Sequence, residues 1–200
     1  RVIKYTNDLL KKPKPSEQDL EVLKIYSEAL VKYGINLIIE RKKFIEMLNP
    51  EVAKISLAIS NETEKTELKY MPNVEKDDFL LKTFRQLKKD LYLQTTGLGP
   101  HKDDFIFEIN GKDAASFASQ GQQRTSSIAL KLGLANLFDK LGMDNIVILD
   151  DVFSELDKER QNQIMQLFKE DKQIFITTTT IDSIHETLLE NSNIIKIERE

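Results

Sequence analysis

The stretch Ile146-Val147-Ile148-Leu149-Asp150-Asp151 decides the fold expected for this chain. Its four apolar residues predict a strand buried on both faces, as in a parallel sheet covered by helices. Two carboxylates follow at the carboxyl end of the strand, where open α/β sheets bind their ligands. A carboxylate there can hold Mg²⁺ beside nucleotide phosphates, and a second one can activate a water. The alternative is a strand that ends in an ordinary polar turn.

The segments around this strand alternate between helix and strand. Apolar spacing predicts a helix over 122–141 before it, then a helix over 158–169 and a strand over 174–176. A short helix near 183–188 and a last strand over 194–197 complete the expected order. Such alternation is typical of an α/β sheet.

The first half of the chain is expected to begin with a long helix. Ser16 is its expected N-cap, and Glu17 and Asp19 favour the positive end of the helix dipole. Gly34 weakens or kinks the helix, and Asn49-Pro50 ends it after Leu48.

Shorter elements are expected between this helix and residue 111. Alternating residues predict a hairpin of strands over 54–60 and 67–71. Helical spacing returns over 79–93, and a strand over 105–109 runs into Asn110-Gly111, a strong hairpin-turn signal.

Composition limits the classes of function. The chain has 200 residues, a formal net charge of −4, no cysteine and two histidines. A strongly basic nucleic-acid binder is therefore excluded for the chain as a whole, although basic clusters occur at 11–14 and 41–43, where a solvated helix face is the alternative. Disulfides, thiolate zinc sites and cysteine nucleophiles are excluded as well. No apolar run is long enough to span a bilayer and the chain starts without a secretory signal, so we expect no membrane contact and a cytoplasmic location.

A second motif precedes the predicted helix over 122–141. Ser119-Gln120-Gly121-Gln122-Gln123-Arg124 combines a hydroxyl, a glycine that permits close approach, and free N–H groups at a helix N-terminus. These features together make an anion site. An ordinary helix cap is the alternative.

Two weaker features follow the carboxylate pair. Ser154-Glu155-Leu156-Asp157 begins three residues after Asp151, and Thr177-Thr178-Thr179-Thr180 ends the next strand. A threonine run at a strand end is also typical of solvated β structure. Each feature is weak alone, and the order and spacing of all four carry the argument.

Taken together with Gly99–Asp104 (GPHKDD), these segments resemble the C-terminal half of the RecF family, bacterial repair ATPases with an ABC/SMC-like head. The resemblance implies an α/β fold. Residues 1–94 would form a helical arm with a short β-hairpin, and residues 95–200 would form the C-terminal lobe of the head. The motifs from Gly99 onward are specific, whereas the first half matches only in general style.

The resemblance also implies roles for the residues of the two main motifs. Asp150 would serve the Mg²⁺ site, and Asp151 would stand at the position of the catalytic carboxylate. The signature segment would contact ATP bound to the opposite subunit, through Ser119, Gln120, Gly121, Gln122, Gln123 and Arg124.

The remaining motif residues receive their roles in the same way. Ser154 and Asp157 would form the D-loop at the dimer interface, and Thr178 would occupy the switch position. One further family motif has no role that the residues explain: His101, Lys102, Asp103 and Asp104. For His101 the alternative is a loop residue bonded to backbone.

One expected motif is missing from the sequence. An ATPase of this class needs G-x-x-x-x-G-K-[ST] to hold the β- and γ-phosphates, and no such motif occurs here. We therefore expect a C-terminal fragment that alone hydrolyses ATP poorly or not at all.

The resemblance further implies ligands and partners for the full-length protein. These are ATP and Mg²⁺, an ATP-dependent homodimer, double-stranded DNA and duplex–single-strand junctions, and RecR, with RecO in the same pathway. The alternatives are a non-hydrolysing DNA- or protein-binding module, or half of another SMC-like ATPase.

Overall fold

Helix α2 (Glu17–Ile59) contributes to both compact units of the chain. The computed structural model describes residues 1–152, 156–167, 172–181, 184, 186–190 and 192–197. Unit 1 consists of residues 1–46 and 68–106, and unit 2 of residues 47–67 and 107–200. Each unit is thus built from two separate stretches of chain. The division into 1–94 and 95–200 stays a prediction, because these contact-based units do not identify a head and an arm.

The predicted end of the long helix at Asn49-Pro50 is wrong, because α2 continues through Pro50 to Ile59. The strand predicted over 54–60 is wrong for the same reason. Val52, Ile55 and Ile59 are each 1% exposed, and their spacing is that of one helix face. Proline costs a helix interior about 3 kcal/mol. Burial of several such side chains, at about 1.5–3 kcal/mol each, outweighs that cost.

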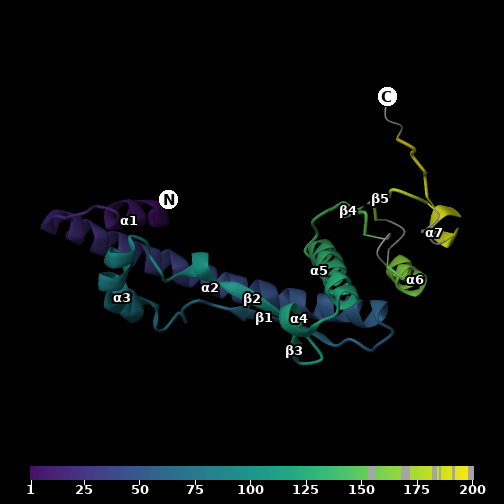
Figure 1. Cartoon of the computed structure of the whole chain (residues 1–200), viewed down its shortest axis with the longest axis horizontal. Coiled ribbons are helices and arrows are strands. Elements are labelled where there is room, and N and C mark those ends of the chain that lie inside the picture. Colours follow the sequence, from purple (N-terminus) through teal and green to yellow (C-terminus); the bar gives the residue numbers. More distant parts are fainter. Residues whose placement is uncertain (153–155, 168–171, 182–183, 185, 191, 198–200) are drawn as a thin grey trace. The chain divides into compact units, whose positions relative to one another are not determined.

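Unit 1 places two further helices against the N-terminal part of α2. These are α1 (Val2–Leu10), which was not predicted, and α3 (Phe79–Leu93), which confirms the helix predicted over 79–93 (Figure 1). Its buried cluster joins α2 and α3 side chains to the strand-to-helix connection: Leu30, Val31, Ile38, Val74 and Phe79. Gly34 is required there, since a Cβ would lie 2.5 Å from Phe79 Cε1. Close packing, not a kink, therefore explains this glycine.

A three-stranded sheet has the order β1-β2-β3. The strands are β1 (Thr66–Met71), β2 (Asp104–Ile109) and β3 (Lys112–Asp113). The predicted strands at 67–71 and 105–109 are confirmed, but β1 neighbours β2 and not a strand at 54–60. β2 and β3 pair antiparallel around Asn110-Gly111, with φ of 50° and 76°. Positive φ at both positions is that of a type I′ turn, so the hairpin-turn prediction is confirmed.

In unit 2 the short helix α4 (Ala114–Phe117) leads into α5 (Gln120–Lys140), which confirms the helix predicted over 122–141 (Figure 1). Helix α5 packs closely on α2. A Cβ added to Gly133 would lie 2.7 Å from Val52 Cγ2 and 3.1 Å from Val52 N. The absence of a side chain at Gly133 therefore sets the distance between the two helices.

Strands β4 (Val147–Asp150) and β5 (Ile174–Thr177) pair in parallel, which confirms the α/β architecture. The prediction of a strand buried on both faces is wrong in the described chain. Val147 and Leu149 are buried, whereas Ile148 is 63% exposed. An apolar run of four residues does not distinguish one covered face from two.

The remaining predictions concern the end of the chain. Helix α6 (Lys158–Gln166) confirms most of the helix predicted over 158–169, whose last two residues lie outside the described residues. Helix α7 (Glu186–Glu190) overlaps the helix predicted near 183–188, of which 183 and 185 are also not described. The strand predicted over 194–197 is wrong: these residues are described without strand structure, and Ile195 and Ile197 are 80% and 90% exposed.

Candidate nucleotide-contacting site

The signature segment forms the exposed first turn of α5. Ser119 is the N-cap: the Gln122 backbone N–H donates to Ser119 Oγ (3.3 Å), and the Ser119 N–H donates to Gln122 Oε1 (3.0 Å). This capping box satisfies two backbone donors that a helix start otherwise leaves unpaired. Gln120, Gly121 and Arg124 are also exposed. The helix-cap alternative therefore describes the local structure, and the dipole of α5 still favours an anion at this turn.

Gln123 anchors the same turn to the preceding helix. Its side-chain amide donates to the backbone oxygens of Ala114 (3.3 Å) and Ala118 (3.5 Å). The first turn of α5 is therefore held on the side of α4 by a residue of the motif itself.

Arg160 also holds this turn, and sequence reasoning missed it. Its Nη1 donates to the Gly121 backbone oxygen (3.1 Å) and to the hydroxyl of buried Thr125. The local signal for Arg160 is only its position three residues after Asp157, which matches a helix cap. Asp157 indeed caps α6, because its Oδ1 accepts the Arg160 backbone N–H at 2.8 Å. The other predicted D-loop residue, Ser154, lies outside the described residues.

The two predicted carboxylates are at the end of β4, where Thr177 of β5 is hydrogen-bonded to both residues. Thr177 donates its hydroxyl to Asp150 Oδ1. The Asp151 backbone N–H points back to Thr177, 3.1 Å from both its backbone oxygen and its hydroxyl oxygen. Asp151 has a φ of 49°, a left-handed conformation that is uncommon for residues other than glycine. The bonds to Thr177 thus fix the strand end on both sides of the Asp150–Asp151 peptide.

Thr178, the predicted switch residue, bonds within its own segment. Its hydroxyl donates to the Thr180 backbone oxygen at 2.8 Å. In the described chain Thr177, not Thr178, contacts the carboxylate pair. The threonine run signalled this strand end but not which of its members faces the carboxylates.

The side chains at this strand end offer only oxygen donors. Asp150 and Asp151 are exposed, and Thr177 supplies a hydroxyl next to them. Oxygen donors of this kind suit Mg²⁺, which keeps several waters and binds through one or two carboxylates plus phosphates. Among the described residues no group of three or more acidic, histidine or cysteine side chains could hold a metal. The residues therefore fit Mg²⁺ only as part of a site that nucleotide phosphates complete.

Asp103 is the buried residue of the GPHKDD motif, with a side chain only 2% exposed. It accepts hydrogen bonds from Arg41 Nη1 (2.9 Å), the Asn73 backbone N–H (2.9 Å) and the Tyr70 hydroxyl. Burial, followed by the bond to Asp103, raises the pKa of Tyr70 to about 12. Asp103 thus joins α2, the end of β1 and the loop after it within unit 1.

The other residues of this motif have simpler surroundings. His101 is exposed and lies in a short 3-10 helix (Pro100–Lys102), and its Nε2 is 3.2 Å from the Thr96 backbone oxygen, so its ring is bonded to backbone. Lys102 is exposed. Asp104 is exposed as well and accepts the N–H of the next residue, Phe105, at 2.8 Å.

The two basic clusters are partly neutralised. Lys12 pairs with Asp19 at 2.6 Å, and this bond is the main reason that the pKa of Asp19 falls to about 2. Lys43 pairs with Glu40 at 2.8 Å, and Arg41 faces Asp103. The solvated-face alternative thus describes part of each cluster.

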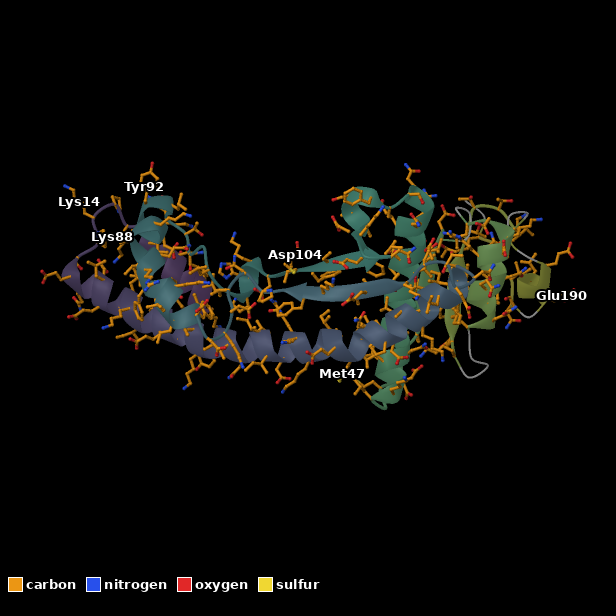
Figure 2. All side chains as sticks on the ribbon, turned by 90° about the horizontal axis from the view of Figure 1, so that it is seen from below. Lys14, Met47, Lys88, Tyr92, Asp104 and Glu190 are labelled. Atoms are coloured by element: carbon orange, nitrogen blue, oxygen red, sulfur yellow. The ribbon has the colours of Figure 1, made fainter. Side chains whose placement is uncertain are left out.

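Charge is nevertheless distributed unequally between the two units. Unit 1 has 17 lysines and arginines against 13 aspartates and glutamates, which gives it a net charge of +4. Since the whole chain has a net charge of −4, the net charge of unit 2 is −8. Lys14, Lys88 and Tyr92 are exposed in unit 1 (Figure 2). Within the described ranges, no helix is both long and apolar enough to cross a membrane.

The parallel strands with their terminal carboxylates and the capped signature turn define a class. This is the C-terminal lobe of an ABC-type ATPase head. The comparisons with known proteins then give the family. No family model matches, but the chain is 37% identical to the DNA replication and repair protein RecF of Lachnospira eligens over 200 residues, covering 98% of this chain and 55% of that protein. With RecF of Clostridium kluyveri the identity is 36% over 206 residues, covering 100% and 56%.

A solved structure agrees with these relatives. The recombination mediator protein RecF-ATP of the RecFOR pathway superposes with a TM-score of 0.75 and 32% identity, over 90% of this chain and 51% of that one. The chain is therefore similar in sequence and in fold to the C-terminal half of RecF. It spans about half the length of the curated relatives that it matches.

Proposed function

We propose that this chain is the C-terminal half of an ATP-driven DNA clamp of the RecF type, which acts in DNA replication and recombinational repair. In the complete protein two heads close on ATP, and closure grips DNA. The observation that carries this proposal is the exposed first turn of α5, where Ser119, Gly121 and Gln122 present a capped helix N-terminus. Such a terminus suits the γ-phosphate of a nucleotide held by a second head.

The carboxylates at the end of β4 would serve the nucleotide of their own head. Asp150, hydrogen-bonded to Thr177, is placed to hold Mg²⁺ through water. Asp151 is placed to orient or deprotonate an attacking water. A P-loop must be supplied by residues outside this sequence, so the site is composite.

The proposal also includes binding to DNA and to partner proteins. The positive charge of unit 1 supports local contacts to phosphates of a duplex or of a duplex–single-strand junction. The solved relative is named as part of the RecFOR pathway, which supports RecR as a partner, with RecO acting in the same pathway. We place this activity in the cytoplasm, where bacterial chromosomal DNA lies.

The test is Ser119→Arg in the full-length protein, with the exposed α5 residue Lys131→Gln as the matched control. Arginine at the cap removes the hydroxyl and places a bulky cation where the partner's nucleotide would lie. ATP-dependent dimerisation, measured by analytical ultracentrifugation, should be lost, while ATP binding by the monomer should persist. Dimers at the wild-type level would refute the signature assignment.

A second candidate function is a module that binds DNA or protein without turnover. The net charge of +4 on unit 1 favours it, because contacts to phosphates need no bound nucleotide. Association with DNA or protein that ignores ATP in the full-length protein would support this candidate over the clamp.

A further inference from the structure

The Arg160 side chain lies where three segments distant in sequence meet within unit 2. Its Nη1 reaches the first turn of α5 through the Gly121 backbone oxygen and the Thr125 hydroxyl. Its Nη2 lies 3.3 Å from Glu64 Oε1, in the connection between α2 and β1. Its own helix, α6, begins at the cap formed by Asp157. One guanidinium therefore connects the signature turn, the D-loop helix and the connection between α2 and β1.

Glu64 places a buried carboxylate beside the Arg160 guanidinium. Its side chain is only 6% exposed, and its Oε2 has no hydrogen-bond partner among the described residues. Arg160, at 24% exposure, is the cation that faces it within the described chain. Removing one partner of a buried ion pair leaves the other charge uncompensated, which costs far more than the pair contributes. Glu64 thus fixes the direction of the guanidinium.

Thr125 completes the geometry at the signature turn. It is fully buried, and its hydroxyl donates to the Gly121 backbone oxygen at 2.9 Å while accepting a hydrogen bond from Arg160. Gly121 therefore has its carbonyl bound by two donors. A fork of parallel N–H donors, which lysine lacks, lets arginine serve this turn and Glu64 at once.

A second contact between α6 and the same connection does not involve Arg160. Asn61 donates to Glu159, and the Gln163 side chain donates to Asn61 Oδ1 at 2.8 Å. Helix α6 is consequently attached to the residues after α2 on both sides of Arg160. Loss of Arg160 alone should therefore free the signature turn more than it displaces α6.

We propose that Arg160 is the positioning residue of the signature turn, holding Gly121 in register with the D-loop helix and with the buried Glu64 in the connection between α2 and β1. The proposal rests on the proposed function, in which this turn meets nucleotide across two heads. Donors that meet a phosphate must be held within tenths of an ångström. Arg160 consequently acts on head closure and not on the first nucleotide-binding step.

The experiment uses the full-length protein with Arg160→Gln and Arg160→Lys, and Lys158→Gln as the matched control on an exposed part of α6. Hydrogen bonds to a charged group are worth enough that Arg160→Gln should weaken ATP-dependent dimerisation about tenfold or more. Arg160→Lys keeps the charge but not the fork and should fall between Gln and wild type. ATP affinity of the monomer, measured by equilibrium dialysis, should stay at the wild-type value in all three variants.

Two further variants make the result decisive. Thr125→Val removes the hydroxyl at nearly constant shape and should weaken dimerisation in the same direction, so it replaces the Arg160 variants if those fail to fold. Glu64→Gln combined with Arg160→Gln should be less than additive, since the two side chains act as one unit.

The outcomes separate this proposal from the proposed function. Wild-type dimerisation in Arg160→Gln and Thr125→Val, with dimerisation lost in Ser119→Arg, would overturn the role of Arg160 alone. Equal loss of monomer ATP affinity and of dimerisation would also overturn it, because that pattern describes a general structural role. Persistent dimers in Ser119→Arg would instead overturn the proposed function.

Discussion

Replacing Asp103 by alanine should destabilise the protein strongly, whereas replacing its neighbour Asp104 should not. Asp103 is 2% exposed and accepts hydrogen bonds from Arg41, Tyr70 and the Asn73 backbone. Asp104 is exposed and bonds only the adjacent Phe105 N–H among the contacts described. The two positions offer a matched pair: same residue type, adjacent in sequence, opposite in surroundings.

The magnitude follows from the three donors. Hydrogen bonds to a charged acceptor contribute about 1.5–3 kcal/mol each when buried. Arg41 is 40% exposed, so its ion pair is discounted to about 1 kcal/mol or less. The part-buried Tyr70 donor contributes about 1.5–3 kcal/mol and the exposed Asn73 N–H about 0.5–1.5 kcal/mol, so the expected loss for Asp103→Ala is about 2–5 kcal/mol. In a chain of this size that corresponds to a fall in Tm of about 10 °C.

Urea and thermal unfolding followed by circular dichroism measure both variants. Asp104→Ala should remain within about 0.5 kcal/mol of wild type, as for other surface substitutions. The reasoning is refuted if Asp103→Ala loses less than about 1 kcal/mol, or if the two variants lose equal stability.

Three other predictions test the packing, the titration and the strand end. Gly133→Ala should lower the free energy of unfolding by about 1–3 kcal/mol despite a better helix propensity, because the new Cβ would meet Val52; unchanged stability in urea would contradict this. Tyr70→Phe should remove an ionisation step near pH 12 from an ultraviolet titration. Since the folded-state pKa of Tyr70 is raised, its contribution to stability is complete below about pH 10 and disappears as the pH rises through about 12. Asp151→Asn in the full-length protein should retain ATP-dependent dimers and lose hydrolysis, and normal turnover would exclude a catalytic role.

Elements with local signals could be predicted from the sequence. The bounds of α3 followed from apolar spacing, and the hairpin turn followed from Asn110-Gly111. The parallel pairing of β4 with β5 followed from two apolar runs separated by a helix. In each case the determining residues are neighbours along the chain.

Elements that depend on distant residues could not be predicted. The continuation of α2 through Pro50 depends on burial of Val52, Ile55 and Ile59, which a local helix-ending signal does not include. The polar pairs are further apart still, because Arg160 and Glu64 are separated by 96 positions. No periodic pattern links such residues, so the candidate site was predicted by its motifs but not by the side chains that support them.

The hairpin turn has a consequence for how this protein ages chemically. Asn-Gly sequences deamidate when the following backbone nitrogen attacks the asparagine side chain. Here Asn110 Oδ1 accepts the Lys65 N–H at 2.9 Å, and its Nδ2 donates to the Thr63 backbone oxygen at 3.1 Å. The folded turn therefore holds the amide away from attack, while an unfolded chain does not. The extent of deamidation at Asn110 should therefore increase with the time that a molecule has spent unfolded.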